Sequence, residues 1–336
     1  MLKSNFLILV KRFALYSLYS LIQHVRFVIN RRREKSLSLL FSYVLRALRI
    51  ILYVPGHHRL NKILKSFGDL GFIARRTYYL YLYKYLSTSL DTEKRQKILI
   101  NHYEFFKKNF PYHILRQIFR NGLVIWSETR GSDRYEIKLA DAYPFEEEGC
   151  LSLIFHVNES PLYTISFTFC NGVFFGIVDD QVIYVTRIQG VRESLDKISD
   201  ASKAYSDNAL PVLLISALEG MAISLGIRTL VGVSLCNRVG NATIGENGFQ
   251  KNYDEFWRTF ESIRIAGGDY ILSLPVPFKA ISLIKSKHRS RVIAKRKIRQ
   301  FISKKTYFFF MNEVLTGKKI RINGNLRVAR ENRAIA

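Results

Sequence analysis

Two short stretches of the chain contain residue types that could perform chemistry. The first is the run RIQGVR at residues 187–192. Arg187 and Arg192 each carry a planar guanidinium, which forms paired hydrogen bonds to a phosphate or a carboxylate. Gly190 allows a ligand to approach the backbone closely, because glycine has no Cβ. Together with Gln189, these residues are candidates for holding an anionic cofactor. The alternative is an ordinary strand end that runs into a polar loop.

The second stretch is the polar, glycine-rich loop of residues 237–248 and the aromatic segment that follows it. Tyr253 has the chemistry of a general acid, and Asn237 has an amide that could donate to a developing oxyanion. We predict these two as catalytic residues, facing the 187–192 run across one cleft. The alternative is an aromatic helix over 252–263 that fills a gap in the core.

Other kinds of site find little support in the sequence. There is no phosphate-binding or dinucleotide-binding glycine motif, no zinc spacing of Cys and His, and no nucleophile elbow. The acidic triplet at 146–148 is interpreted as a solvated loop, because adjacent carboxylates cannot all point at one metal ion. Cys150, Cys170 and Cys236 are expected to be buried free thiols. We therefore predict no metal centre.

The elements that must position these residues form a mixed sheet. Apolar, β-branched segments separated by turn residues predict strands over 150–158, 162–170, 173–178 and 182–189. An apolar helix over 211–226 and another strand over 229–235 follow. A strand, a long helical crossover and a strand form a parallel pair. The fold class is therefore α/β (α+β by some schemes): an antiparallel meander that runs into one βαβ unit, with a ligand cleft where the pairing changes.

The flanking regions are expected to be helical. Residues 75–86 (RRTYYLYLYKYL) predict a helix that packs its tyrosines on its neighbours; nucleic-acid stacking and a membrane-interface belt are the alternatives. A helix over 91–110 should begin with Asp91 or Thr92 as its N-cap. A last strand over 269–277 precedes a basic helix over 280–305. The predicted organisation is thus an amphipathic segment (1–56), a helical region (57–145), an α/β core (146–280) and a basic helix with its tail (281–336).

Charge is distributed unevenly over the 336 residues, whose formal net charge is +25. Residues 1–130 hold 24 Lys and Arg against 6 Asp and Glu, a net charge of +18. Residues 131–270 hold 11 against 19, a net charge of −8, and residues 271–336 hold 17 against 2, a net charge of +15. Two basic ends around an acidic centre predict an anionic partner surface, either lipid or nucleic acid.

The basic residues of the two ends are the candidates for membrane contact. Apolar residues between 7 and 28 share one side of a predicted helix, and no run reaches the roughly 20 apolar residues of a membrane span. Such a helix suits a membrane interface; a helix packed on the protein's own core and a cleaved targeting peptide are the alternatives. We predict neither a signal peptide nor a transmembrane helix. The predicted membrane contacts are Arg12, Arg26, Arg31, Arg32, Arg33, Lys35, Lys295, Arg296, Lys297 and Arg299.

In its order of elements the 150–275 region resembles the GNAT-type N-acetyltransferase fold. That fold binds the pyrophosphate of acyl-coenzyme A after its fourth strand, with the pattern Gln/Arg-x-x-Gly-x-Gly/Ala. Arg187 and Gly190 match this pattern, and Arg192 stands where the pattern has a small residue. The resemblance implies acyl-coenzyme A or acyl carrier protein as the cofactor.

A second, more specific resemblance covers roughly residues 50–305. The run at 187–190, Leu225-Gly226-Ile227, Gly232-Val233-Ser234, the segment 252–257 (NYDEFW) and the basic helix are similar to the VirK/YbjX family of Gram-negative bacteria. Residues 206–210 (SDNAL) depart from the family's pattern, which is closer to His-Gly-Leu-Arg-Pro. That family is implicated in virulence and in tolerance of cationic antimicrobial peptides.

The resemblance implies a role in the bacterial envelope. We expect a peripheral protein on the cytoplasmic face of the inner membrane that supports envelope integrity, with acyltransferase activity toward a membrane-associated acceptor as one form of that role. Two alternatives stay open. The first is a membrane-surface binding module without enzymatic activity, and the second is a nucleic-acid-binding protein that uses the same basic faces.

Overall fold

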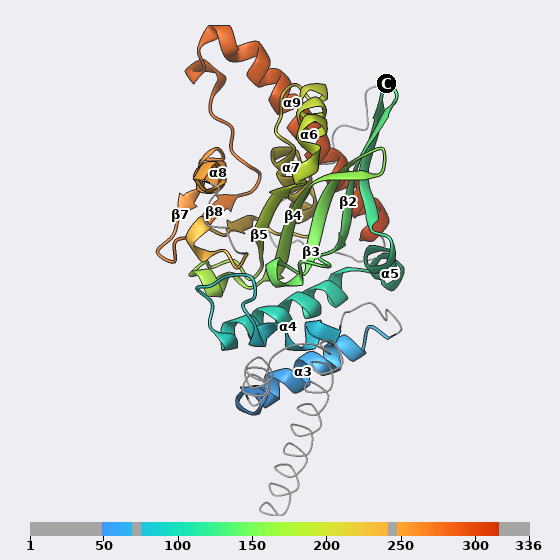
Figure 1. Cartoon of the computed structure of the whole chain (residues 1–336), viewed down its shortest axis with the longest axis vertical. Coiled ribbons are helices and arrows are strands. Elements are labelled where there is room, and N and C mark those ends of the chain that lie inside the picture. Colours follow the sequence, from blue (N-terminus) through green and yellow to red (C-terminus); the bar gives the residue numbers. More distant parts are fainter. Residues whose placement is uncertain (1–48, 69–74, 241–246, 316–336) are drawn as a thin grey trace, which may run out of the picture.

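The computed structural model describes residues 49–68, 75–240 and 247–315, and in them an eight-stranded sheet of order β1-β2-β3-β4-β5-β6-β8-β7 (Figure 1). The strands are β1 (Leu123–Arg130), β2 (Asp133–Asp141), β3 (Leu151–Val157), β4 (Ser160–Cys170), β5 (Val182–Gly190), β6 (Thr229–Gly232), β7 (Ile263–Arg264) and β8 (Tyr270–Ser273). Neighbours are antiparallel except β5 and β6, which are parallel. The predicted meander followed by a βαβ unit is confirmed.

The sheet begins earlier in the chain than the sequence analysis predicts. β1 and β2 form a hairpin inside the region 57–145, which was expected to be helical, so that expectation is wrong for its last part. In β2 the buried Tyr135, Ile137 and Leu139 alternate with charged residues. This period of two is the pattern of a half-buried strand, and the many charges between the apolar residues hid it.

The predicted strand over 173–178 is wrong. Residues Gly172–Phe175 form a 3-10 turn instead. The side chain of Asn171 accepts a hydrogen bond from the backbone N–H of Val173 at 2.9 Å, and Gly176 ends the turn with φ +70°. Asn-Gly therefore acts here as a cap for one turn of helix and not as a two-residue hairpin, because asparagine side chains also cap helices.

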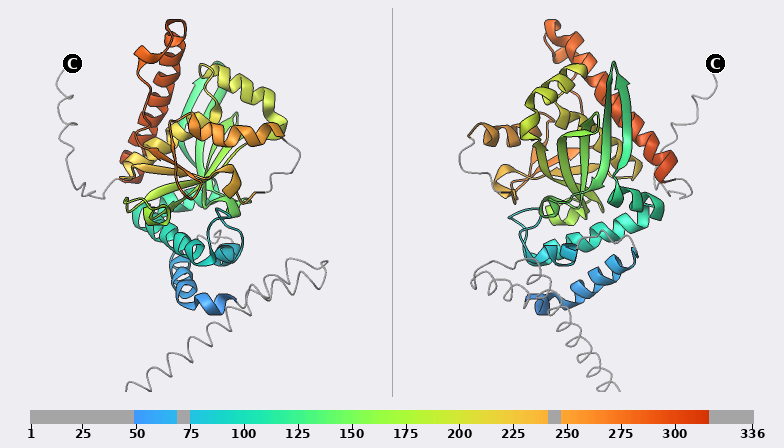
Figure 2. Two further views of the ribbon diagram at one scale, coloured as in Figure 1. Left: turned by 90° about the vertical axis from the view of Figure 1, so that its left-hand side faces the viewer. Right: turned by 45° about the vertical axis from the view of Figure 1, so that its right-hand side comes forward.

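Two long helices pack together on the sheet. α7 (Leu210–Ser224) is almost wholly buried, as expected for the apolar crossover, and Gly226 follows it with φ +77°. α9 (Ser286–Phe309) lies along α7, and a Cβ at Gly220 would overlap the carbonyl of Ser303. Glycine is therefore required where the two helix backbones meet. The N-terminal end of α9 extends past the sheet (Figure 2).

Further helices support one end of the sheet. α4 (Thr92–Asn109) lies across that end, with α3 (Val54–Lys65) against it and α5 (Tyr112–Arg120) leading into β1 (Figure 1). The predicted N-cap is confirmed, because the Asp91 carboxylate accepts from the N–H of Lys94 at 2.8 Å. On the buried face of α4, His102 stacks on Phe169 of β4 with ring centroids 5.6 Å apart. Burial lowers the pKa of His102 to about 3, so this side chain is a neutral core residue at physiological pH.

The tyrosine-rich segment packs into the protein. Residues Arg75–Leu82 form a 3-10 helix, and Tyr79, Tyr81 and Tyr85 are buried. The interpretation as a packing segment is therefore confirmed for these three rings. A base could not stack on a ring that the core already covers.

The predicted membrane contacts at the N-terminal end lie outside the described residues; they are Arg12, Arg26, Arg31, Arg32, Arg33 and Lys35. Within the part of the chain that is described, no helix combines the length and the apolar character needed to cross a bilayer.

Candidate functional site

The parallel strands β5 and β6 separate after a short pairing. They are in register only from Ile183 to Val185, and from Thr186 to Gly190 β5 continues beside β4 alone within the described residues. The divergence was predicted near Gly190, and it begins already at Thr186. Backbone groups of β5 beyond this point have no neighbouring strand on that side.

A tryptophan from α8 (Asn247–Arg258) fills the place where the strands part. Trp257 is fully buried, and its indole N–H donates to the carbonyl of Val233 at 3.0 Å. Its ring lies against Gly232, where a Cβ would overlap it. Further pairing of β6 with β5 would need the Val233 carbonyl as an acceptor. The Trp257 side chain already satisfies this carbonyl. The aromatic helix predicted after the glycine-rich loop does fill a gap in the core. This gap is the space between the diverging strands β5 and β6.

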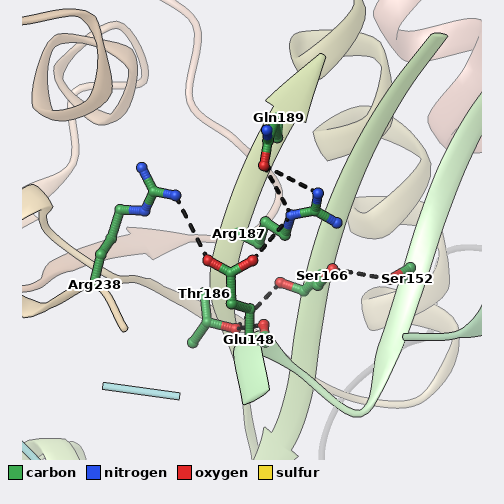
Figure 3. A network of polar contacts seen from close by, with 7 residues as sticks. All are labelled: Glu148, Ser152, Ser166, Thr186, Arg187, Gln189 and Arg238. Carbon is green, nitrogen blue, oxygen red and sulfur yellow. Dashed lines mark hydrogen bonds and ion pairs between the residues drawn. The ribbon is translucent and has the colours of Figure 1, made fainter. Parts of the chain in front are cut away.

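Beside this divergence a carboxylate lies between two arginines (Figure 3). Glu148 Oε2 is 3.1 Å from Nε of Arg187 on β5, and its Oε1 is 3.6 Å from Nη2 of Arg238, which follows β6. All three side chains are nearly buried. The interpretation of residues 146–148 as a solvated loop is therefore wrong for Glu148, which pairs with arginines that the sequence separates widely from it.

The Arg187 guanidinium is held from three sides. Gln189 Oε1 accepts from its Nε at 3.2 Å and its Nη2 at 3.0 Å, and the Phe145 ring lies under it with the centroid 3.5 Å from Cζ. Burial lowers the pKa of Arg187, while Glu148 raises it and Arg238 lowers it further. Arg187, Gln189 and Gly190, which were predicted to bind the cofactor, thus lie together at the end of β5. A Cβ at Gly190 would press on the Tyr163 ring.

The loop that carries Glu148 is fixed to the sheet beneath it. The hydroxyl of Thr186 on β5 donates to the carbonyl of Glu148, and the hydroxyls of Ser152 and Ser166 are 2.9 Å apart on the neighbouring strands (Figure 3). The Thr186 contact fixes the backbone of Glu148 before any ligand arrives, and the serine pair joins β3 to β4 beside it.

Tyr253, a predicted catalytic residue, lies beside the same cluster. The Arg238 Cζ is 4.8 Å from the centroid of its ring. Its hydroxyl is buried and has no hydrogen-bond partner among the described residues, and burial raises its pKa above the usual value. The structure therefore brings Tyr253 close to Arg238, and both lie near enough to Arg187 and Glu148 to interact with them electrostatically. As a phenol, Tyr253 is held in its protonated form.

Asn237, the other predicted catalytic residue, uses its amide within the protein. Its Nδ2 donates to Gly267 O at 2.7 Å and to Asp269 Oδ1 at 2.8 Å, which accounts for both N–H bonds. In this arrangement it ties the loop after β6 to β8. Its role as a donor to an oxyanion stays a prediction. In this structure both amide hydrogens already have acceptors.

Of the remaining candidates, Arg192 begins a 3-10 turn after β5, and its side chain lies outside the described part. Among the described residues no group of His, Cys, Asp and Glu could hold a metal ion. Cys150 and Cys170 are buried free thiols as predicted, whereas the prediction is wrong for Cys236, which is exposed.

The four predicted membrane contacts on α9 differ in their surroundings. Lys295 Nζ donates to the carbonyl of Asp207 at 2.6 Å, Arg299 Nε donates to Asn208 Oδ1 at 2.9 Å, and Arg296 donates to the carbonyl of Lys279. Lys297 is exposed. The divergent stretch 206–210 therefore anchors the basic helix to the body, and three of the four cations help to hold α9 in place.

Three residues that organise this region were not predicted from the sequence: Glu148, Arg238 and Asp269. Asp269 is buried and accepts from the side chains of Tyr184, Ser234 and Asn237. Glu148 is one of three consecutive glutamates, and no local feature sets it apart from the other two. Its partners, Arg187 and Arg238, could be identified only once the position of β5 in the sheet was known.

A family model for proteins of unknown function, DUF535, matches residues 35–298. The chain belongs to the DUF535 family. This is the family that includes VirK/YbjX, so that resemblance is confirmed at the level of family membership. The DUF535 match contains the whole sheet, the Glu148 cluster and most of α9, and its description assigns no activity. No curated protein and no solved structure is measurably similar to this DUF535 chain.

Proposed function

We propose that this DUF535 protein works at an anionic membrane surface, which it meets through the outward face of α9. The observation that carries the proposal is an alternation on that face. Ile293, Phe301 and Phe308 are 39%, 44% and 47% exposed, and the exposed Lys297 and Lys304 stand between them. The steps between these residues are 4, 4, 3 and 4, which places all five on one side of a helix.

The charge of α9 fits the same partner. The helix contains no acidic residue. Lys285, which caps its N-terminal end, and Lys287 and Arg289 in its first turn are exposed. Large apolar side chains between lysines insert at the boundary of headgroups and acyl chains, while the lysines remain at the anionic headgroups. A lipid surface uses both kinds of residue, whereas duplex DNA would use the cations alone.

Vesicle binding by the full chain tests this proposal. The triple substitution Ile293→Ser, Phe301→Ser and Phe308→Ser should weaken binding to vesicles of phosphatidylglycerol and phosphatidylcholine by about 1–2 kcal/mol per residue, because apolar area stays in water. Lys297→Gln with Lys304→Gln should cost about 2 kcal/mol, on anionic vesicles only. Flotation against lipid concentration measures both.

A matched control changes the same residue types elsewhere on the surface. Val178 is fully exposed and Lys197 is exposed, so Val178→Ser with Lys197→Gln should leave vesicle binding unchanged. The lysine variant and the control should unfold within about 0.5 kcal/mol of the wild type, because these side chains are exposed. The triple substitution also removes packing of three partly covered side chains, so circular dichroism checks that this variant is folded. Tight binding of DNA at physiological salt, with no binding to anionic vesicles, would favour the nucleic-acid alternative in place of this one.

Acyl transfer at the cluster is a second candidate function, and the parting of β5 and β6 favours it. A pantetheine-like chain could pair with the unpartnered edge of β5 by strand addition, near Arg187 and Gly190. Calorimetry with acyl-coenzyme A and with acyl carrier protein tests it. We expect Arg187→Lys with Arg192→Ala to weaken donor binding by about 1.5–3 kcal/mol per lost charged hydrogen bond. Absence of donor binding by the wild type would leave the membrane-surface function without this activity.

A further inference from the structure

Among the described residues, the Glu148 cluster carries a surplus of buried positive charge. Its two guanidiniums, of Arg187 and Arg238, have 7% and 13% of their side-chain area exposed, and they share the one carboxylate of Glu148. A buried charge without a counter-ion is expensive, because water no longer solvates it. One more anion would therefore balance the charge of the cluster.

The hydrogen-bond donors of the cluster are also incompletely used. Arg238 Nε and the Tyr253 hydroxyl are buried and have no partner among the described residues. Arg238 reaches Glu148 only at 3.6 Å, which is beyond a good hydrogen bond. The two groups lie close together, since the Arg238 Cζ is 4.8 Å from the centroid of the Tyr253 ring. Unsatisfied buried donors are rare in native structures, and two of them here lie beside arginines that share a single carboxylate.

The cluster is close to solvent through an aromatic side chain. The ring of Phe145, which stacks on Arg187, is 45% exposed, and Tyr143 nearby in sequence is 66% exposed. Gln189 on the other side of the guanidinium is only half-buried. A ligand with an anionic end and an organic remainder could therefore place its charge on the arginines and its remainder against these rings.

From these contacts we infer that Arg238, Tyr253 and Arg187 form a binding site for a phosphate-type oxyanion, with Glu148 as the internal anion that pairs with the two arginines until the ligand arrives. The donors come from three elements and approach from different directions, as Figure 3 shows for the two arginines. Such an arrangement suits a tetrahedral phosphate better than a planar carboxylate. The site is separate from the outward face of α9, and neither proposal depends on the other.

Titration calorimetry of the full chain with inorganic phosphate, sn-glycerol 3-phosphate and acetate tests this site. We expect both phosphates to bind, and acetate to bind more weakly. Arg238→Gln should weaken phosphate binding about tenfold to a hundredfold, the ratio expected for a charged hydrogen bond. Absence of binding by both phosphates, or stronger binding by acetate, would overturn the assignment.

Tyr253→Phe separates a ligand contact from a structural role. Its hydroxyl has no partner among the described residues, so the variant should unfold at the wild-type temperature and yet bind phosphate several-fold more weakly. Tyr270→Phe is the matched control: Tyr270 on β8 also has a buried, unpartnered hydroxyl and an arginine 5.9 Å from its ring. It should change neither quantity. Equal phosphate affinity of the Tyr253 variant and the wild type would contradict the site.

Glu148→Gln provides an independent readout. Removing the internal anion leaves two buried guanidiniums uncompensated, so the variant should be less stable. Phosphate should then raise its melting temperature more than that of the wild type, because a ligand stabilises the state that binds it. Affinity for phosphate should rise at least several-fold. A variant that phosphate neither binds more tightly nor stabilises more would refute the role of Glu148 as the competing anion.

To distinguish a free phosphate from a lipid headgroup, short-chain phosphatidylglycerol is added below its micelle concentration. Tighter binding than for sn-glycerol 3-phosphate, lost equally in Arg238→Gln, would identify a phospholipid headgroup as the source of the oxyanion. Binding by the soluble phosphates with none by the lipid would identify a small phosphorylated metabolite.

Discussion

Replacing Asp269 with alanine should lower the free energy of unfolding by about 4 kcal/mol, because several buried donors lose their acceptor at once. Asp269 is 3% exposed. Its Oδ1 accepts from the backbone N–H of Ser234 at 3.0 Å and from Asn237 Nδ2 at 2.8 Å, and its Oδ2 accepts from the Tyr184 hydroxyl at 2.8 Å. These donors lie on β5 and on the loop after β6, so the loss would also loosen the segment that carries Arg238.

Urea unfolding followed by circular dichroism measures this change, with the wild-type slope as a check on two-state behaviour. Asp269→Asn keeps the shape of the side chain and should be less damaging, although it turns one acceptor into a donor. Asp180→Ala, at an exposed aspartate, is the matched control and should stay within about 0.5 kcal/mol of the wild type. A loss below about 1 kcal/mol for Asp269→Ala would mean that the donors find other acceptors.

Replacing Trp257 with alanine should cost about 3–5 kcal/mol, the range for deleting a large buried aromatic side chain. The ring is fully buried against Gly232, and the indole N–H satisfies the carbonyl of Val233. The alanine variant would lose both the packing and the hydrogen bond at the point where β5 and β6 part. The two strands could then pair further, which would move Arg187 relative to Arg238.

Two further variants separate these contributions. Trp257→Phe keeps most of the buried area and removes the N–H, so it should cost about 1–3 kcal/mol for the unsatisfied carbonyl and the smaller ring. Gly232→Ala adds a Cβ that overlaps the Trp257 ring and should cost a similar amount through overpacking. If Trp257→Ala and Trp257→Phe were equally stable, the ring itself would not hold the strands apart.

The central part of the fold could be predicted from local patterns. The apolar run of α7 with Gly226 after it, the β-branched runs of β3, β4 and β5, and the Asp91 cap are all read from neighbours in sequence. Their order then requires a parallel pairing of β5 and β6, because a helical crossover separates them. Where the local signal allowed two outcomes, as at Asn171-Gly172, the prediction failed.

Only some of the residues of the candidate site were predicted. Arg187, Gln189 and Gly190 could be named because they end a recognisable strand, and Tyr253 because an aromatic helix follows a long polar loop. Glu148 and Arg238 could not be named. Glu148 resembled the two glutamates before it, and nothing local distinguishes a carboxylate that will be buried between arginines from one that faces water.

Periodicity and composition along the chain are enough to predict β3, β4, β5 and β6, the βαβ unit and the basic character of α9, whereas they did not predict β1 and β2. Only the tertiary structure decided which α9 cations bind the protein and which face outward, and that Trp257 keeps β5 and β6 apart. It also decided that Glu148 joins Arg187 to Arg238. The physical reason is that such contacts form between segments distant in sequence, and their energies depend on burial that exists only once the chain has folded.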